Sequence, residues 1–166
     1  EGLLDFSRSQ PSEPQRCDLD SLARRAVRLL RHNPRVDSMT IELNIAPDLP
    51  QPLVNEDQIL QVLLALVLNA ADAAPRGRIT ISARRGPHGE AILSVEDDGP
   101  GVPREIQGRI FEPFFTTKPT GQGTGLGLAV AYGLVKAHGG QLDLIPQSGR
   151  GARFDIVLPA DAEVMA

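Results

Sequence analysis

The 166-residue chain has little of several things, and each scarcity excludes a class of protein. A single cysteine, Cys17, allows no internal disulfide, which suits a reducing compartment. With 17 Lys and Arg against 21 Asp and Glu, a formal net charge of −4, the chain lacks the basic excess of a general nucleic-acid binder. Its longest apolar run, residues 59–68, is interrupted by Gln61 and is too short to cross a membrane. The composition therefore favours a cytoplasmic globular domain that contacts neither nucleic acid nor membrane.

The first eighteen residues of the chain divide into two parts. Leu3, Leu4 and Phe6 are typical of the apolar end of a truncated helix, and two prolines within residues 9–15 indicate a linker. The first residue is not Met, and no basic region or cleavage site follows it, so we expect a piece of a longer protein rather than a signal peptide. We expect a helix end and linker over residues 1–17, one folded domain over 18–160 and a tail over 161–166.

Alternation of apolar and polar residues predicts a sheet. It marks residues 39–45, 79–83, 91–95 and 154–158 as strands, and Leu142 and Leu144 indicate a fifth. Because such strands are apolar on one face and polar on the other, we expect a mixed, mainly antiparallel sheet with one solvated face and helices on the other. The turn over residues 86–89 joins two of these strands as a hairpin.

Three segments have the pattern of helices. Asp18 or Asp20 can cap a first helix that ends near residue 30. Residues 55–74 are apolar nearly all round, which is typical of a buried helix. Residues 126–137 form a third, and the glycines at 139 and 140 after it are typical of a helix C-cap. Residues 98–123 form a loop longer than a compact domain usually tolerates without a functional reason. The predicted fold class is therefore α+β, a two-layer sandwich with one long loop.

Asp97 is the first candidate functional residue. It continues the register of Leu93 and Val95, which directs its carboxylate to the apolar side of the sheet, where a charge is costly unless it is paired. Taken alone, Asp97 fits two readings. It either opens the turn over residues 97–101 as an ordinary strand-end Asp, or accepts a hydrogen bond from a ligand at the floor of a pocket. The exocyclic amine of adenine is such a donor, whereas guanine presents an oxygen there.

Asn69 lies in a polar stripe on the otherwise apolar helix. Steps of three and four residues connect Gln58, Gln61, Ala65, Asn69 and Asp72. An amide oxygen suits Mg²⁺, which takes further oxygen ligands from water and phosphates. The alternative is an Asn that hydrogen-bonds to neighbouring backbone, and the stripe alone does not decide between the two.

The segment 121–128 has glycine at every second position and runs directly into a predicted helix. Its backbone can approach a ligand closely, and N–H groups at a helix N-terminus can bind phosphate. It is neither a Walker loop, since no Gly-Lys-Ser/Thr follows, nor a dinucleotide fingerprint. A flexible linker is the alternative, which the apolar helix directly after it disfavours. Lys118, just upstream, can bring a positive charge to terminal phosphates.

Together these segments resemble the nucleotide-binding motifs of sensor histidine kinases. Residues 66–73 resemble their N box, 97–102 their G1 box, 111–118 their F box and 123–128 their G2 box. The resemblance covers residues 18–159, and the form Phe-Glu-Pro-Phe-Phe-Thr-Thr-Lys is closest to the nitrogen-regulation branch. It implies the Bergerat-type ATP-binding fold shared with gyrase, Hsp90 and MutL, with residues 111–122 as a mobile ATP lid.

The same resemblance implies roles for individual residues. Asn69 would bind Mg²⁺ and Asp97 the adenine amine, Gly99 and Gly101 would shape the wall beside the base, and Lys118 with the backbone of 123–127 would hold the phosphates. It assigns no catalytic residue to the chain itself. The implied ATP-binding residues are Asn69, Asp72, Asp97, Gly99, Gly101, Val102, Phe111, Thr116, Thr117, Lys118, Gly123, Thr124, Gly125, Leu126, Gly127 and Leu128.

The resemblance also implies partners. Residues 3–8 resemble the end of the dimerisation helix, whose bundle normally carries the phospho-accepting histidine. His32, His88 and His138 lie in other surroundings and are interpreted as structural or surface residues. We expect a monomeric chain that binds ATP and Mg²⁺ without phosphorylating itself. It would act with the helical dimerisation domain of a homodimeric parent kinase and a downstream response regulator, and the sequence leaves open whether that parent is membrane-anchored.

Two departures from the family's pattern bear on activity. Ala65 lies one turn before Asn69, where the family usually has Asn and related ATPases a Glu base, and Ala152 replaces a Thr that often supports the adenine-binding carboxylate. The leading hypothesis is a catalytic domain that presents the γ-phosphate of ATP to a histidine by positioning and charge neutralisation. The alternative is a degenerate module that binds nucleotide and signals by lid closure. A gyrase- or MutL-type ATPase is disfavoured, because Ala65 cannot act as the base.

Overall fold

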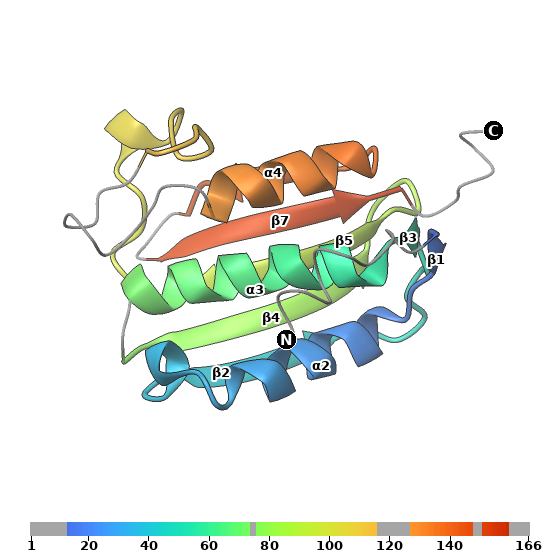
Figure 1. Cartoon of the computed structure of the whole chain (residues 1–166), viewed down its shortest axis with the longest axis horizontal. Helices are drawn as coiled ribbons and strands as arrows, with labels where there is room; N and C mark the ends of the chain where they lie inside the picture. The colour runs from blue at the N-terminus through green and yellow to red at the C-terminus, as the bar shows by residue number, and fades with distance from the viewer. Residues whose placement is uncertain (1–12, 74–75, 116–126, 148–150, 160–166) are drawn as a thin grey trace, which may run out of the picture.

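A five-stranded sheet forms one layer of the fold (Figure 1). The computed structural model describes residues 13–73, 76–115, 127–147 and 151–159. In spatial order the strands are β2 (Thr40–Ile45), β4 (Arg78–Arg85), β5 (Ala91–Asp97), β7 (Ala152–Leu158) and β6 (Gln141–Ile145). β2 runs parallel to β4, and the other neighbouring strands are antiparallel. The predicted mixed, mainly antiparallel sheet is confirmed.

Three α-helices in the described ranges cover one face of this sheet (Figure 1): α2 (Leu19–Leu30), α3 (Glu56–Ala73) and α4 (Gly127–Ala137). α3 lies between the other two and packs on both. Its residues Ile59 and Leu63 are fully buried and share one core with Ile81 and Leu93 of the strands. The predicted two-layer α+β fold is thereby confirmed. Within these ranges, no helix combines the length and apolarity that crossing a bilayer requires.

Local signals determine where α2 begins. Asp18 caps the helix, because its Oδ1 accepts hydrogen bonds from the N–H groups of the second and third residues after it, at 3.0 and 3.3 Å.

Upstream, β1 (Gln15–Arg16) pairs antiparallel with β3 (Leu53–Val54), and Cys17 is 1% exposed. This pairing and burial show that residues 15–17 contact the folded part of the chain. The division of the chain at residues 17 and 160 stays a prediction.

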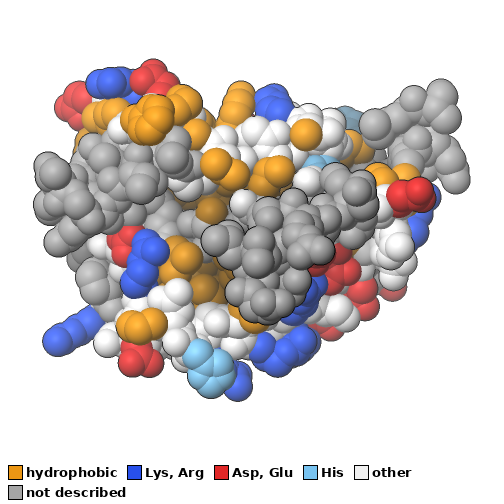
Figure 2. Space-filling view, in the orientation of Figure 1, with side chains coloured by type: hydrophobic (Ala, Val, Ile, Leu, Met, Phe, Trp, Pro, Cys, Tyr) orange, Lys and Arg blue, Asp and Glu red, His pale blue; other side chains and the backbone are white. Residues whose placement is uncertain are grey.

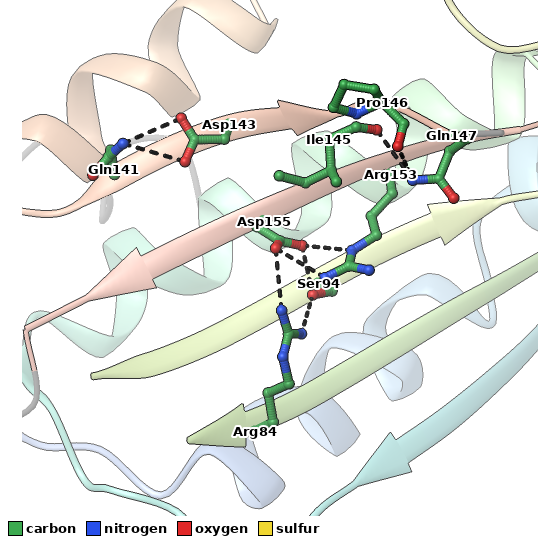
Figure 3. Close-up of polar contacts among 9 residues, drawn as sticks. All are labelled: Arg84, Ser94, Gln141, Asp143, Ile145, Pro146, Gln147, Arg153 and Asp155. Carbon is green, nitrogen blue, oxygen red and sulfur yellow. Dashed lines mark hydrogen bonds and ion pairs between the residues drawn. The ribbon is translucent and has the colours of Figure 1, made fainter. Parts of the chain in front are cut away.

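The sheet face away from the helices carries a cluster of polar side chains (Figure 3). Asp155 of β7 accepts hydrogen bonds from Arg153 (2.9 and 3.0 Å), from Ser94 of β5 (2.7 Å) and from Arg84 of β4 (3.2 Å). Burial alone would raise the pKa of Asp155, but the hydrogen bonds and the two guanidinium charges together lower it. The face away from the helices is polar, as predicted, but at Asp155 it is not open to solvent, because side chains from three strands bury this residue to 6% exposure.

Candidate functional site

The candidate site lies where the C-terminal ends of α3 and β5 meet the N-terminal end of α4 (Figure 1). Segment 98–115, which contains the short helix η2 (Arg104–Ile106), lies at the same end. Asn69 and Asp72 lie on α3, and Asp97 ends β5. Gly99, Gly101, Val102, Phe111, Gly127 and Leu128 lie in that segment or at the start of α4. The other predicted residues lie outside the described ranges: Thr116, Thr117, Lys118, Gly123, Thr124, Gly125 and Leu126.

Asp97 is buried at the end of β5, as its register predicts, and is 7% exposed. Its Oδ1 accepts a hydrogen bond from the N–H of Gly99 at 2.8 Å, and the N–H of Ala152 on the adjacent strand also donates to the carboxylate. Burial raises the pKa of Asp97 despite these two donors, and the charges of Asp98 and Glu96 add to the rise. Asp97 therefore opens the turn and also presents a desolvated carboxylate, and its acceptance of a hydrogen bond from a ligand stays a prediction.

Two glycines let the backbone segments around Asp97 approach one another closely. Gly151, directly before β7, has a φ of +104°, and a Cβ there would lie 2.2 Å from the Asp97 carbonyl oxygen. Gly101 has a φ of +85°, and its Cβ would lie 2.9 Å from the Gly151 carbonyl oxygen. Both positions therefore require glycine. Sequence reasoning placed Gly101 in the pocket wall but missed Gly151, whose only local signal is a glycine three residues before the predicted strand 154–158.

Asn69 and Asp72 lie one turn apart near the end of α3. Asn69 is half-buried. The Asp72 carboxylate accepts hydrogen bonds from two guanidinium nitrogens of Arg35, with Nε at 3.1 Å from Oδ1, and Nη2 of Arg35 also donates to the Leu68 carbonyl oxygen at 3.4 Å. Arg35 belongs to the short helix η1 (Pro34–Val36). Sequence reasoning missed this residue, because two strands, β2 and β3, and their loops separate η1 from α3, and no local pattern connects the two.

Aromatic side chains attach the segment after η2 to α4 and β7. Phe111 stacks on Tyr132 of α4, with ring centroids 5.1 Å apart, and meets Phe154 of β7 edge to face at 6.1 Å. Phe114 is instead 74% exposed, with a φ of +68°. Figure 2 shows hydrophobic side chains gathered over this segment, at the upper left. The described part of the region that resembles an F box thus has two rings packed against the core, Phe111 and Phe115, and one facing solvent, Phe114.

His138 has the structural role that its position suggests. Its Nδ1–H donates to the carbonyl oxygen of Leu134 at 2.8 Å, and its Nε2 accepts from the N–H of Asn55 at 3.2 Å. These two hydrogen bonds connect the end of α4 to the residue before α3. His32 is exposed beyond the end of α2, and His88 lies in the hairpin turn beside a carboxylate.

The described residues contain no group of three or more His, Cys, Asp or Glu side chains able to hold a metal. A magnesium ion at this end would therefore find at most two such ligands among the described residues. The amide oxygen of Asn69 fits one position, because Mg²⁺ in nucleotide sites takes one or two protein oxygens together with phosphate oxygens and waters. The donor set fits an ion that arrives with a nucleotide.

The chain is similar to known proteins over most of its length. The family described as histidine kinase-, DNA gyrase B-, and HSP90-like ATPase matches residues 54–162. Sensor kinase CckA of Brucella abortus (strain 2308) is 38% identical over 174 residues, which cover 95% of this chain and 18% of CckA. The nucleotide-free catalytic domain of histidine kinase ThkA has a TM-score of 0.79 at 30% identity, covering 92% of this chain and 99% of that one. Full-length ShkA in complex with AMPPNP has a TM-score of 0.77 at 31% identity, covering 95% of this chain and 34% of that one.

The similarity to ThkA extends over the whole of its catalytic domain, whereas the chain spans less than a fifth of CckA. It therefore corresponds to one domain of such kinases. The described part of the chain shows the two-layer architecture in which the predicted N and G1 boxes lie at one end of the fold. The chain belongs to the family of histidine kinase-, DNA gyrase B- and HSP90-like ATPases, and it has the sequence and fold of a histidine kinase catalytic domain.

Proposed function

We propose that this domain binds ATP with Mg²⁺ and presents the γ-phosphate to a histidine on a separate helical domain of its parent kinase. The observation that supports this most directly is the Asp97 carboxylate, which is buried, held by two backbone N–H groups and placed where α3 and α4 converge. A desolvated carboxylate is stabilised by a further hydrogen-bond donor. The adenine amine is such a donor and the guanine oxygen is not, so the site is expected to prefer ATP over GTP.

The raised pKa of Asp97 gives this recognition a pH dependence. The ionised carboxylate accepts the adenine amine, and protonation removes that acceptor. Because burial raises the pKa of Asp97 above the ordinary range of an aspartate, ATP affinity is expected to be full above that raised pKa and to fall as the pH decreases through it. Titrations over a series of pH values measure this dependence, and the Asp97→Asn variant should lack it.

The phosphates would lie toward the end of α3 and the start of α4. Asn69 would offer its amide oxygen to the Mg²⁺ that arrives with ATP, and this ion, when bound, supplies charge neutralisation at the phosphates. Gly127 begins α4, and the N–H groups of that helix end, together with those of residues 123–126 and the charge of Lys118, would hold the phosphate oxygens. Transfer then depends on positioning, and no covalent intermediate forms on this domain.

Exposed apolar side chains beside the site suggest where the helical domain docks. Phe114 is 74% exposed, and on α4 Val130 and Tyr132 are 44% and 37% exposed. Because Phe111 stacks on Tyr132, the F-box region lies against the part of α4 that carries Tyr132. A helix with an apolar stripe that packs on Phe114 and Tyr132 would bring its histidine toward the γ-phosphate. A response regulator would then take the phosphoryl group, and we propose from the form of the F box that the parent belongs to the nitrogen-regulation branch.

The alternative is a degenerate module without phosphotransfer, and it rests on Ala65 and Ala152. Ala65 is half-buried one turn before Asn69, and its methyl group can neither orient water nor accept a proton. Transfer to histidine needs no water-activating base, because the acceptor is itself the nucleophile. The N–H of Ala152 also supports Asp97 without a side-chain hydroxyl. Both substitutions are therefore compatible with a kinase.

Phosphotransfer decides between the two functions. The chain joined to the helical domain of its parent is incubated with γ-labelled ATP and Mg²⁺, and label on a histidine of that domain is the expected result. Replacement of that histidine by Gln serves as the control. If ATP binds but no label appears, either with the unsubstituted sequence or with the Ala65→Asn variant, the degenerate module is the better description.

A further inference from the structure

The phosphate end of the proposed site is electrostatically unfavourable on α3. This helix carries the carboxylates of Glu56, Asp57 and Asp72 and contains no Lys or Arg. Its C-terminal end, where Asn69 and Asp72 lie, also carries the negative end of the helix dipole. A polyphosphate beside Asn69 would face the Asp72 carboxylate and the negative end of the helix dipole. Because α3 has no Lys or Arg, a side chain that compensates these charges has to come from another element.

Arg35 of η1 supplies positive charge at this place. Its guanidinium donates to the Asp72 carboxylate through Nε and Nη2, and to the Leu68 carbonyl oxygen through Nη2. It therefore contacts residues on both sides of Asn69 in the chain. The planar guanidinium suits this geometry, because it binds a carboxylate through two nitrogens at once and stays charged at any physiological pH.

The position of Arg35 is fixed by the short helix that carries it. The backbone N–H of Arg35 donates to Oδ1 of Asn33 at 2.8 Å, which caps η1. The next residue, Val36, is 5% exposed, and η1 packs on α3. The side chain of Arg35 nevertheless stays 47% exposed, so a ligand can approach the ion pair from solvent.

We propose that Arg35 is a positioning residue for the phosphates: by neutralising Asp72 and the carbonyl end of α3, it allows a magnesium-bound polyphosphate to approach Asn69. This inference rests on the proposed ATP-binding function and adds to it a residue from outside the predicted motifs. It also gives Asp72 an indirect role in the site, as the group that holds Arg35 in place rather than as a direct ligand of the nucleotide.

The test compares ATP with adenosine, which has the same base and no phosphates. The 166-residue chain is titrated with ATP and Mg²⁺ by calorimetry and with adenosine by NMR. Arg35→Gln is expected to weaken ATP binding about five- to thirtyfold and to leave adenosine binding unchanged. The matched control is Arg24→Gln, which removes another exposed Arg–Asp pair, to Asp20 at 2.9 Å on α2, and should change neither affinity. Equal losses for ATP and adenosine, or no loss for either, would overturn the proposal.

A double variant tests the neutralisation itself. When Arg35→Gln is combined with Asp72→Asn, ATP affinity is expected to return to within about threefold of that of the unsubstituted chain, because the Asp72 charge that Arg35 compensates is also removed. An affinity that stays as low as in Arg35→Gln alone would overturn this mechanism. If the unsubstituted chain binds neither ATP nor adenosine, the proposed function fails and the inference fails with it. If the unsubstituted chain binds both ligands, and Arg35→Gln has the same ratio of ATP affinity to adenosine affinity, only the inference fails.

Discussion

Replacing Gly151 with alanine tests the close approach that positions Asp97. The added Cβ would lie 2.2 Å from the Asp97 carbonyl oxygen, a backbone atom that cannot rotate away, and the φ of Gly151 is +104°. A non-glycine residue in this region of φ costs roughly 1–3 kcal/mol, and relieving the overlap requires β5 and the start of β7 to separate. We expect Gly151→Ala to lower the free energy of unfolding by about 3 kcal/mol.

Gly133→Ala is the matched control for this substitution. Gly133 lies within α4, and a Cβ there would meet nothing within 4 Å. Alanine is favoured over glycine in a helix interior by about 0.5–1 kcal/mol, so this variant should be more stable than the parent. Urea unfolding followed by circular dichroism measures both variants under the same conditions. A Gly151→Ala variant within about 0.5 kcal/mol of the parent would refute the close approach of the two backbone segments.

Three further predictions concern residues outside the nucleotide site. Asp155→Ala should lower the free energy of unfolding by about 2 kcal/mol at neutral pH, because Arg84 and Arg153 lose their shared carboxylate. The pKa of Asp155 is lowered in the folded state, so its contribution to stability is full above the unfolded pKa of about 3.9 and is lost as the pH falls through the folded-state pKa. The free energies of unfolding of Asp155→Ala and of the unsubstituted chain should therefore converge in acid, and a difference that persists there would contradict this prediction. His138→Ala should lower the free energy of unfolding in urea by about 1–2 kcal/mol, because it removes the hydrogen bond from the N–H of Asn55 to Nε2, and an unchanged midpoint would argue against that hydrogen bond. Cys17, whose pKa burial raises to about 12, should react with a thiol reagent at neutral pH only after the chain unfolds, so rapid labelling of the folded protein would speak against its burial.

Features that depend on neighbouring residues in the chain were predictable. The inward direction of Asp97 followed from strand alternation, because Leu93 and Val95 fix the buried face and Asp97 continues it. The cap of α2 followed equally from Asp18 before an amphipathic run. The fold class followed from the same local patterns, since strands that are apolar on one face must be covered by helices on that face.

Contacts between distant segments were not predictable from local pattern. Arg35 and Asp72 are 37 positions apart, and their ion pair depends on how η1 packs on α3. The need for glycine at position 151 appears only once β7 lies beside the end of β5. Asp155 was assigned to a solvated face by alternation, but arginine side chains on its own and a nearby strand bury it. Each case needs a three-dimensional neighbour that the sequence pattern does not specify.

The central claim is that the Asp97 carboxylate recognises adenine, and calorimetric titration with ATP, with and without Mg²⁺ and with GTP for comparison, tests it most directly. Asp97→Asn is compared with Asp98→Asn, because Asp98 is the exposed neighbour whose carboxylate accepts from the N–H of Arg78 at 2.9 Å. We predict ATP-selective binding that Mg²⁺ strengthens, a loss of about a hundredfold in Asp97→Asn and parent-like affinity in Asp98→Asn. An Asp97→Asn variant that binds ATP as tightly as the parent would contradict the claim.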